Sequence, residues 1–126
     1  MSRTIIATAA APAAPPSYSQ AVKAGGLVFV SGTAPIDPAT GVIVVGPVQA
    51  QVAQCLSNIA AILKAAGSSL DRAVSATLIV ADEDDFAAIN DEWLKWFPND
   101  PPARQGAKMP VRITGMKVSV AMIAEA

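Results

Sequence analysis

Arg104 is the residue of this sequence with the clearest capacity to bind a ligand. It follows the rigid segment Pro101-Pro102-Ala103, at the start of a stretch, 103–109, that we expect to be extended. A guanidinium fixed in this way presents a planar fork of N–H donors, which matches a carboxylate or a phosphate. The alternative is a surface ion pair with Asp100 or another neighbouring carboxylate.

Several common chemistries are excluded by residue type. Histidine is absent from the 126 residues, which removes the Ser-His-Asp triad, Cys-His dyads and His-containing zinc sites. Cys55 lies on the apolar face of a predicted helix, so we expect a buried and unreactive thiol. The acidic run 82–85 lacks the spacing of a calcium loop and is interpreted as the N-terminal cap of a helix. The residue types therefore predict no metal site.

Composition restricts the partners. Hydrophobic residues make up 52% of the chain and charged residues 15%, against about 25% charged in an ordinary domain. A net charge of −1 disfavours nucleic-acid binding, and no run of about 20 apolar residues predicts a membrane span. Pro12, Pro15 and Pro16 interrupt the Ala-rich N-terminal run, so we expect a cytoplasmic protein rather than an exported one. Self-association is the expected way to cover the excess apolar surface.

Hydrophobic periodicity predicts an α+β fold in one domain, residues 1–126. An apolar face at spacings of three and four predicts a helix that opens at Pro47 and is capped by Gly67, and a second helix is expected over 82–97. Runs of β-branched residues predict a hairpin that joins 27–30 to 42–45. Further strands are expected at 3–6, 72–80, 103–109 and 117–124.

A series of short motifs runs along most of the chain. They include Thr4-Ile5-Ile6-Ala7-Thr8, Tyr18-Ser19-Gln20-Ala21-Val22, Val30-Ser31-Gly32-Thr33-Ala34-Pro35, Asp37-Pro38-Ala39-Thr40-Gly41, Asn58-Ile59, Ala65-Ala66-Gly67-Ser68-Ser69-Leu70, Asp85-Phe86, Ile89-Asn90 and Pro102-Ala103-Arg104. In order and spacing they resemble the Rid/YjgF family of reactive imine/enamine deaminases, also known as the endoribonuclease L-PSP or translation-inhibitor family. The resemblance implies a chorismate-mutase-like mixed sheet with two helices on one face, and a homotrimer with ligand clefts between subunits.

The resemblance also implies an activity and a site. Family members hydrolyse 2-imino or 2-enamino acids to 2-keto acids and ammonia without a cofactor. Arg104 matches the catalytic arginine that binds the substrate carboxylate, Tyr18 matches a pocket tyrosine, and Ser31-Gly32 matches a pocket-forming turn. Gln105 and Gly106 follow the arginine and are expected to line the same pocket.

The sequence departs from the family pattern at two points. Active relatives carry Arg-Ser-Cys where this chain has Arg104-Gln105-Gly106, and Gly106 predicts a roomier pocket or a more mobile rim. The family glutamate that holds the attacking water aligns with Ser119, which takes its place among the predicted catalytic residues; a second glutamate aligns with Ala121. Loss of a general acid/base costs about 10²–10⁴ in rate, so we expect weak hydrolysis.

Two other functions compete with the deaminase. A protein that binds a small carboxylate metabolite without catalysis, as a sensor or regulator, would need Arg104 but no base. The ribonuclease or translation-inhibitor function is disfavoured by the low pI of about 5.2 and by the absence of histidine.

Overall fold

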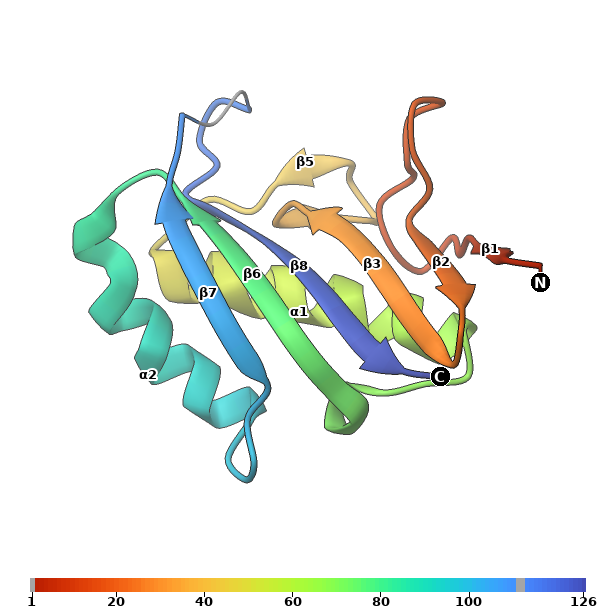
Figure 1. Ribbon diagram of the computed structural model, residues 1–126. Coiled ribbons are helices and arrows are strands. Elements are labelled where there is room, and N and C mark those ends of the chain that lie inside the picture. The colour runs from red at the N-terminus through yellow and green to blue at the C-terminus, as the bar shows by residue number, and fades with distance from the viewer. Residues whose placement is uncertain (1, 111–112) are drawn as a thin grey trace.

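Six strands form one mixed sheet in the computed structural model, which describes residues 2–110 and 113–126. The strands are β1 (Thr4–Ile6), β2 (Ala21–Ala24), β3 (Leu27–Thr33), β6 (Ala73–Val80), β7 (Ala103–Lys108) and β8 (Val118–Glu125). Their order across the sheet is β1-β2-β3-β8-β6-β7, as Figure 1 shows. The pair β6–β7 is parallel and the other pairs are antiparallel. The predicted α+β fold with a mixed sheet is confirmed.

The helix α1 (Val48–Ala65) packs its apolar stripe against the sheet, and Cys55, Leu56 and Ile59 are completely buried. It ends where Gly67 takes a φ of +82°, a conformation that costs glycine little. Ser68 N–H then bonds to the carbonyl of Leu63 at 2.8 Å, which satisfies a helix-end acceptor. No helix in the described residues is long and apolar enough to cross a membrane.

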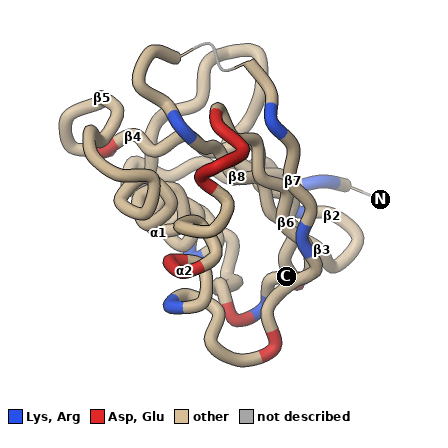
Figure 2. Tube along the Cα trace, turned by 90° about the vertical axis from the view of Figure 1, so that its left-hand side faces the viewer, with Lys and Arg blue, Asp and Glu red and all other residues tan. Residues whose placement is uncertain are grey.

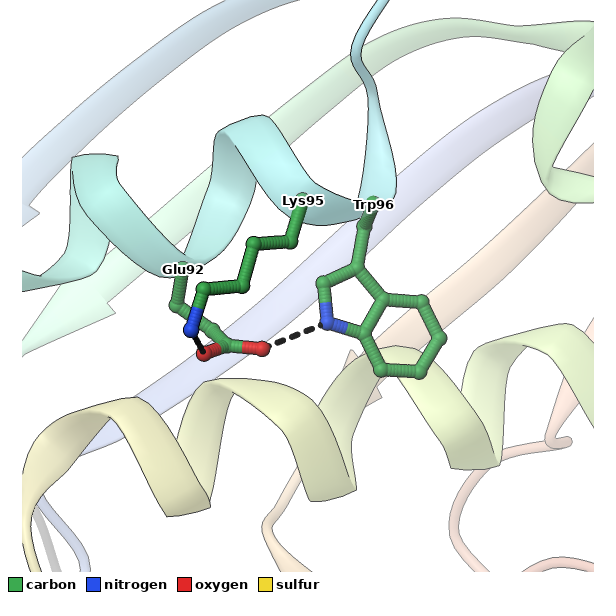
Figure 3. Close-up of polar contacts among 3 residues, drawn as sticks. All are labelled: Glu92, Lys95 and Trp96. Atoms are coloured by element: carbon green, nitrogen blue, oxygen red, sulfur yellow. Dashed lines mark hydrogen bonds and ion pairs between the residues drawn. The ribbon is translucent and has the colours of Figure 1, made fainter.

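The second helix, α2 (Phe86–Trp96), follows a 3₁₀ turn, η2 (Glu83–Asp85), and covers the parallel end of the sheet. Asp82 accepts a hydrogen bond from Asp84 N–H at 2.9 Å, so the acidic run caps this turn rather than α2 itself, where Asp85 makes no side-chain capping bond. The helix expected over 82–97 is thus divided into a turn and a shorter helix. Near the other end of α2, Glu92 accepts from Trp96 Nε1 at 2.9 Å and pairs with Lys95 at 3.3 Å (Figure 3). These contacts lie within α2 and stabilise its last turn.

The predicted hairpin between 27–30 and 42–45 is wrong in its pairing. The turn at Asp37 forms, with Gly41 N–H bonded to the Asp37 carbonyl at 2.8 Å. It joins two short strands, β4 (Ile36–Asp37) and β5 (Val42–Ile43), which pair only with each other in the described chain. Both sides of β3 are already occupied, by β2 and by β8. The sequence reading missed β2, the strand that takes the place given to residues 42–45.

The two faces of the sheet differ completely. Both helices cover one face, as the side view in Figure 2 shows. Alternate residues of β8, such as Val118 and Val120, are fully buried beneath them. The opposite face, here called the open face, carries Ile5 at 52% exposure and Phe29 at 43%. The expected arrangement of two helices on one face is therefore confirmed, and it leaves an apolar surface uncovered.

Candidate functional site

Arg104 lies on β7, the strand at one edge of the sheet, and its side chain turns toward α2. Its Nη2 donates a hydrogen bond to Asn90 Oδ1 at 2.6 Å. Its Cζ lies 5.2 Å from the centre of the Trp93 ring, a cation–π distance. Trp93 is itself 4% exposed and packs against Phe97 with ring centres 4.8 Å apart. The guanidinium thus rests on a fixed aromatic surface while remaining accessible to solvent.

The alternative reading of Arg104 as half of a surface ion pair is wrong. The ion pairs found within residues 2–110 and 113–126 are Lys95–Glu92 and Lys108–Glu83, and all the carboxylate side chains of the sequence lie in those ranges. A guanidinium has five N–H donors, and Asn90 takes one of them. A fixed, exposed cation without a carboxylate is suited to a carboxylate ligand.

Gly106 lies on the same side of β7 as Arg104, because side chains alternate along a strand. A Cβ placed on Gly106 would lie 2.9 Å from Phe86 Cε1 and 3.0 Å from Cζ. The ring of Phe86 therefore fills the space that a side chain would take. The expectation of a roomier pocket at Gly106 is wrong for this reason.

The backbone of β7 also faces outward at these positions. Met109 N–H donates to the carbonyl of Val80 at 3.0 Å, so odd-numbered residues direct their backbone groups toward β6. The N–H groups of Arg104 and Gly106 consequently point away from the sheet. They form a row of donors beside the guanidinium, at an edge that no described strand covers.

Tyr18, Ser31 and Gly32 lie together around a recess of about 100 Å³. Its walls come from the segment 12–14, from β3 and from the apolar side chains of Ile36, Ile62 and Ile113. Tyr18 stands at the rim and is 54% exposed. The structure thus brings these three predicted residues together, although the two motifs that carry them lie on different segments.

Ser31 and Gly32 were expected to form a turn, and this expectation is wrong. They belong to β3, at a β-bulge where three steps along β3, from Val30 to Thr33, match two along β8. The bulge reorients the strand end toward the recess. Ser31 Oγ donates to the carbonyl of Ser19 at 2.6 Å, which leaves its lone pairs available to a ligand.

Ser119 and Gln105 lie on the open face, opposite to the side chain of Arg104. Val118 and Val120 are buried beneath α1, so Ser119 points the other way and lies beside Ile79 in the sheet register. Gln105 Nε2 donates to Thr77 Oγ1 at 3.1 Å on the same face. Within one chain, the expectation that a side chain at 119 points toward Arg104 is wrong.

One chain therefore does not bring the predicted site together. Between β3 and β7 lie β8 and β6, and three strand spacings amount to about 14 Å. Arg104 and Gly106 occupy one edge of the molecule, and Tyr18, Ser31 and Gly32 lie near the other. Ser119 lies between them on the open face.

The remaining candidates have structural roles. Cys55 is completely buried, and its thiol lies 3.8 Å from the carbonyl of Val118. Burial raises the pKa of the Cys55 thiol far above its ordinary value, so it is not a nucleophile. No group of three potential metal-binding side chains occurs in the described part of the chain.

Sequence reasoning assigned no function to three residues that shape the site. Asn90 and Trp93 hold Arg104, and Gln20 holds the recess wall. Asn90 and Trp93 lie three residues apart on α2, a spacing that places both on one helix face. Their link to Arg104 depends on the β6-α2-β7 crossover, which periodicity alone does not predict.

Comparisons with known proteins support the family resemblance. The endoribonuclease L-PSP family model matches residues 8–126. A 2-iminobutanoate/2-iminopropanoate deaminase of Capra hircus is 42% identical over 122 residues, covering 97% of this chain and 89% of the relative. A RutC family protein of Pyrococcus horikoshii is 44% identical over 102 residues and 81% of each chain.

Solved structures agree with the sequence comparisons. A Rid family protein of Yersinia pestis, YyfA, superposes with a TM-score of 0.94 at 32% identity, over 99% of this chain and 100% of its own. The E. coli protein TdcF, solved with bound serine, superposes with a TM-score of 0.90 at 34% identity, over 98% of both chains.

Proposed function

The chain belongs to the Rid/YjgF (endoribonuclease L-PSP) family, and from this premise we propose that it hydrolyses 2-imino acids to 2-keto acids and ammonia. The observation that carries the proposal is Arg104, an exposed guanidinium stacked on Trp93, held by Asn90 and without a carboxylate partner in the described chain. Relatives named as 2-iminobutanoate/2-iminopropanoate deaminases support the reaction. The relative with bound serine supports a small molecule that carries a carboxylate.

The complete site would form between copies of the chain in a homotrimer. The Arg104 edge of one copy would meet the Tyr18 recess of the next, because the two halves lie about 14 Å apart in a single copy. The apolar open face supports this assembly, since Ile5 and Phe29 are 52% and 43% exposed in one chain. A trimer would cover such a surface.

The proposed mechanism uses few groups. Arg104 pairs with the substrate carboxylate, and the outward N–H of Gly106 orients the bound acid. Water adds to the imine carbon, which gives a carbinolamine; its C–N bond then breaks as nitrogen takes up the protons released by the water. The products are a 2-keto acid and ammonia, and the atoms balance without a cofactor.

Activation of the water molecule depends on the residue at position 119. Ser119 can hold a water molecule but is no base near neutral pH. The replacement of the family glutamate by Ser119 therefore favours a slow enzyme. The same observation supports the second candidate, a protein that binds a small carboxylate compound without turning it over.

Ammonia release from a freshly generated 2-imino acid, with and without the protein, separates the two functions. An enzyme accelerates release in proportion to its concentration. A binding protein leaves the rate unchanged while calorimetry detects the carboxylate compound. Neither acceleration nor binding would contradict both proposals.

Mixed assemblies test whether the site is shared between copies. Arg104→Ala and Tyr18→Ala each remove one half of the site, so each variant alone should be inactive. When the two are refolded together at equal amounts, about one interface in four contains both intact halves in a ring of identical contacts. We expect activity to return to about a quarter of the wild-type value.

A matched pair of variants provides the control. Tyr18→Ala and Ser31→Ala both damage the recess of the same chain, so mixing them should restore nothing. Failure of the first pair to recover activity, when mass spectrometry shows mixed trimers, would contradict a shared site.

A further inference from the structure

Tyr18 is carried by a segment that the hydrophobic core hardly holds. Of residues 7–19, all within the described part of the chain, Ala11 alone is buried. The recess of about 100 Å³ lies on one side of this segment, and a more open hollow of about 450 Å³, lined in part by Ala13 and Tyr18, lies on the other. Packing within one chain is therefore insufficient to fix it.

The prolines restrict the backbone conformations of this segment but do not fix its position over the recess. Pro12, Pro15 and Pro16 fix their own φ angles and so reduce the number of conformations open to the chain. The connection between Pro12 and Tyr18 still contains freely rotating bonds. Ordering it over the recess requires a contact that closes the loop.

Gln20 supplies that contact. Its side chain is largely buried, at 7% exposure, and binds the segment at both carboxamide atoms. Oε1 accepts from Thr8 N–H at 2.7 Å, and Nε2 donates to the carbonyls of Thr8 at 3.0 Å and Pro12 at 2.8 Å. The bond to Pro12 closes the loop 12–20, on which Tyr18 lies.

The backbone of Gln20 is also held by a hydrogen bond. Its own carbonyl accepts from Ser31 N–H at 3.0 Å, which ties it to β3 at the bulge. Ser31 Oγ binds the neighbouring carbonyl of Ser19 at 2.6 Å. One residue therefore joins the strand that forms the floor of the recess to the loop that forms its wall.

We propose that Gln20 is a positioning residue, which closes the loop 12–20 and so holds Tyr18 at the rim of the recess. This inference rests on the proposed function for its effect on substrate, because Gln20 would act there through Tyr18 and the wall. Its effect on Tyr18 itself is independent of any activity. The two parts are therefore tested separately.

Tyr18 is the one tyrosine of the sequence, which makes it directly observable. Protein labelled with 3-fluorotyrosine should give a single narrow ¹⁹F resonance. Gln20→Met keeps the length and flexibility of the side chain but makes none of its hydrogen bonds. We expect the ¹⁹F resonance of the folded variant to broaden or split. An unchanged resonance would overturn the proposal.

Gln51→Met is the matched control. Gln51 is also a buried carboxamide, at 1% exposure. Its bonds go to Val44 O, Gly115 O and Lys117 N, outside the loop 12–20. It should lose comparable stability yet leave the ¹⁹F resonance of Tyr18 as in the wild type. A broadened resonance in both variants would assign Gln20 a merely structural role.

The functional readout separates binding from chemistry. For imine hydrolysis, Gln20→Met should raise KM by about tenfold and change kcat by less than about threefold, since the wall positions the substrate rather than reacting with it. Gln51→Met should change neither by more than about twofold. Equal increases in KM for both variants would overturn the positioning role.

An alternative variant is needed if Gln20→Met does not fold, and the ¹⁹F readout remains valid if the wild type is inactive. If Gln20→Met does not fold, Gln20→Asn keeps the carboxamide but withdraws it by one methylene, and its ¹⁹F resonance is judged in the same way. If the wild type hydrolyses no imine, the proposed function fails by itself. A split ¹⁹F resonance in the Gln20 variant then still supports the positioning of Tyr18.

Discussion

Arg104 and Tyr18 reach their positions by different physical means. Arg104 lies on a regular strand and rests on a regular helix, so its place follows from sheet pairing and from the packing of Trp93. Tyr18 lies on an irregular loop that depends on the hydrogen bonds of Gln20 and Ser31. The first arrangement provides a rigid charge, whereas the second provides an adaptable wall. The edge half of the site, Arg104 and Gly106, should therefore determine whether a carboxylate compound binds. The recess half, Tyr18, Ser31 and Gly32, should determine which carboxylate compound is accepted.

The largest expected effect is that of substituting Arg104 on the affinity for a small carboxylate. Arg104→Ala should weaken the binding of a small carboxylate such as pyruvate by about 2–5 kcal/mol, because the ligand carboxylate loses its partner. Arg104→Lys should recover little of this, since a point charge does not reproduce the guanidinium fork or its stacking on Trp93. Isothermal calorimetry measures both variants.

The fold should survive this change, because Arg104 is exposed and makes no ion pair within the described residues. A cooperative thermal transition with only a small fall in midpoint is the control, since Arg104→Ala loses the bond to Asn90 and the contact with Trp93. Equal pyruvate affinities for wild type and Arg104→Ala would show that the edge half does not recognise the carboxylate.

The second prediction tests how rigid the edge of the sheet is around Gly106. Gly106→Cys restores the residue that active relatives carry, but its Cβ would lie 2.9 Å from the ring of Phe86. Forced repacking of this kind costs typically about 1–3 kcal/mol. We expect a lower free energy of unfolding in urea.

Phe86→Leu should relieve the strain, so the double variant with Gly106→Cys tests the cause. Its free energy of unfolding should exceed the value expected from adding the two single effects. Strict additivity would mean that the ring already moves aside and that the edge is less rigid than the structure indicates.

The sequence predicted the regular elements with a clear burial pattern better than the short strands and loops. The stripe of α1 and the alternation of β8 follow directly from burial on one face, so both elements were found. Residues 42–45 form a β-branched run, whereas residues 21–24 carry little side-chain pattern, yet it is 21–24 that pairs with β3. Side-chain pattern therefore found a strand at 42–45 but did not show which segment pairs with β3.

The candidate site follows the same division. Arg104 was recognisable because two prolines precede it and because Pro102-Ala103-Arg104 matches the position of the family's substrate arginine. The residues alone left a surface ion pair open, and only the structure excludes it. The β-bulge at Ser31 and the loop closure by Gln20 could not be read from spacing, since both arise from backbone hydrogen bonds between distant segments. The distance between the two halves of the site could be known only from the strand order.

The third prediction, with the smallest expected effect, concerns the residue that belongs to neither half. Ser119 lies on the open face, whereas Arg104 of the same chain turns toward α2. A carboxylate introduced by Ser119→Glu therefore lies away from its own Arg104 and is not expected to block the guanidinium within the chain. It can act only if a second copy brings its substrate-binding edge to this face.

In the proposed trimer, that carboxylate would hold and deprotonate the attacking water. We expect imine hydrolysis to rise by about tenfold in single-turnover measurements, against the 10²–10⁴ associated with general acid/base catalysis. Ser119→Gln is the matched control, because it has the same size and can hold water but cannot take its proton. A gain in both variants would indicate a change in binding rather than in proton transfer. No gain in either, with the trimer intact, would mean that Ser119 does not reach the reacting carbon, and the binding function would then be favoured over the enzyme.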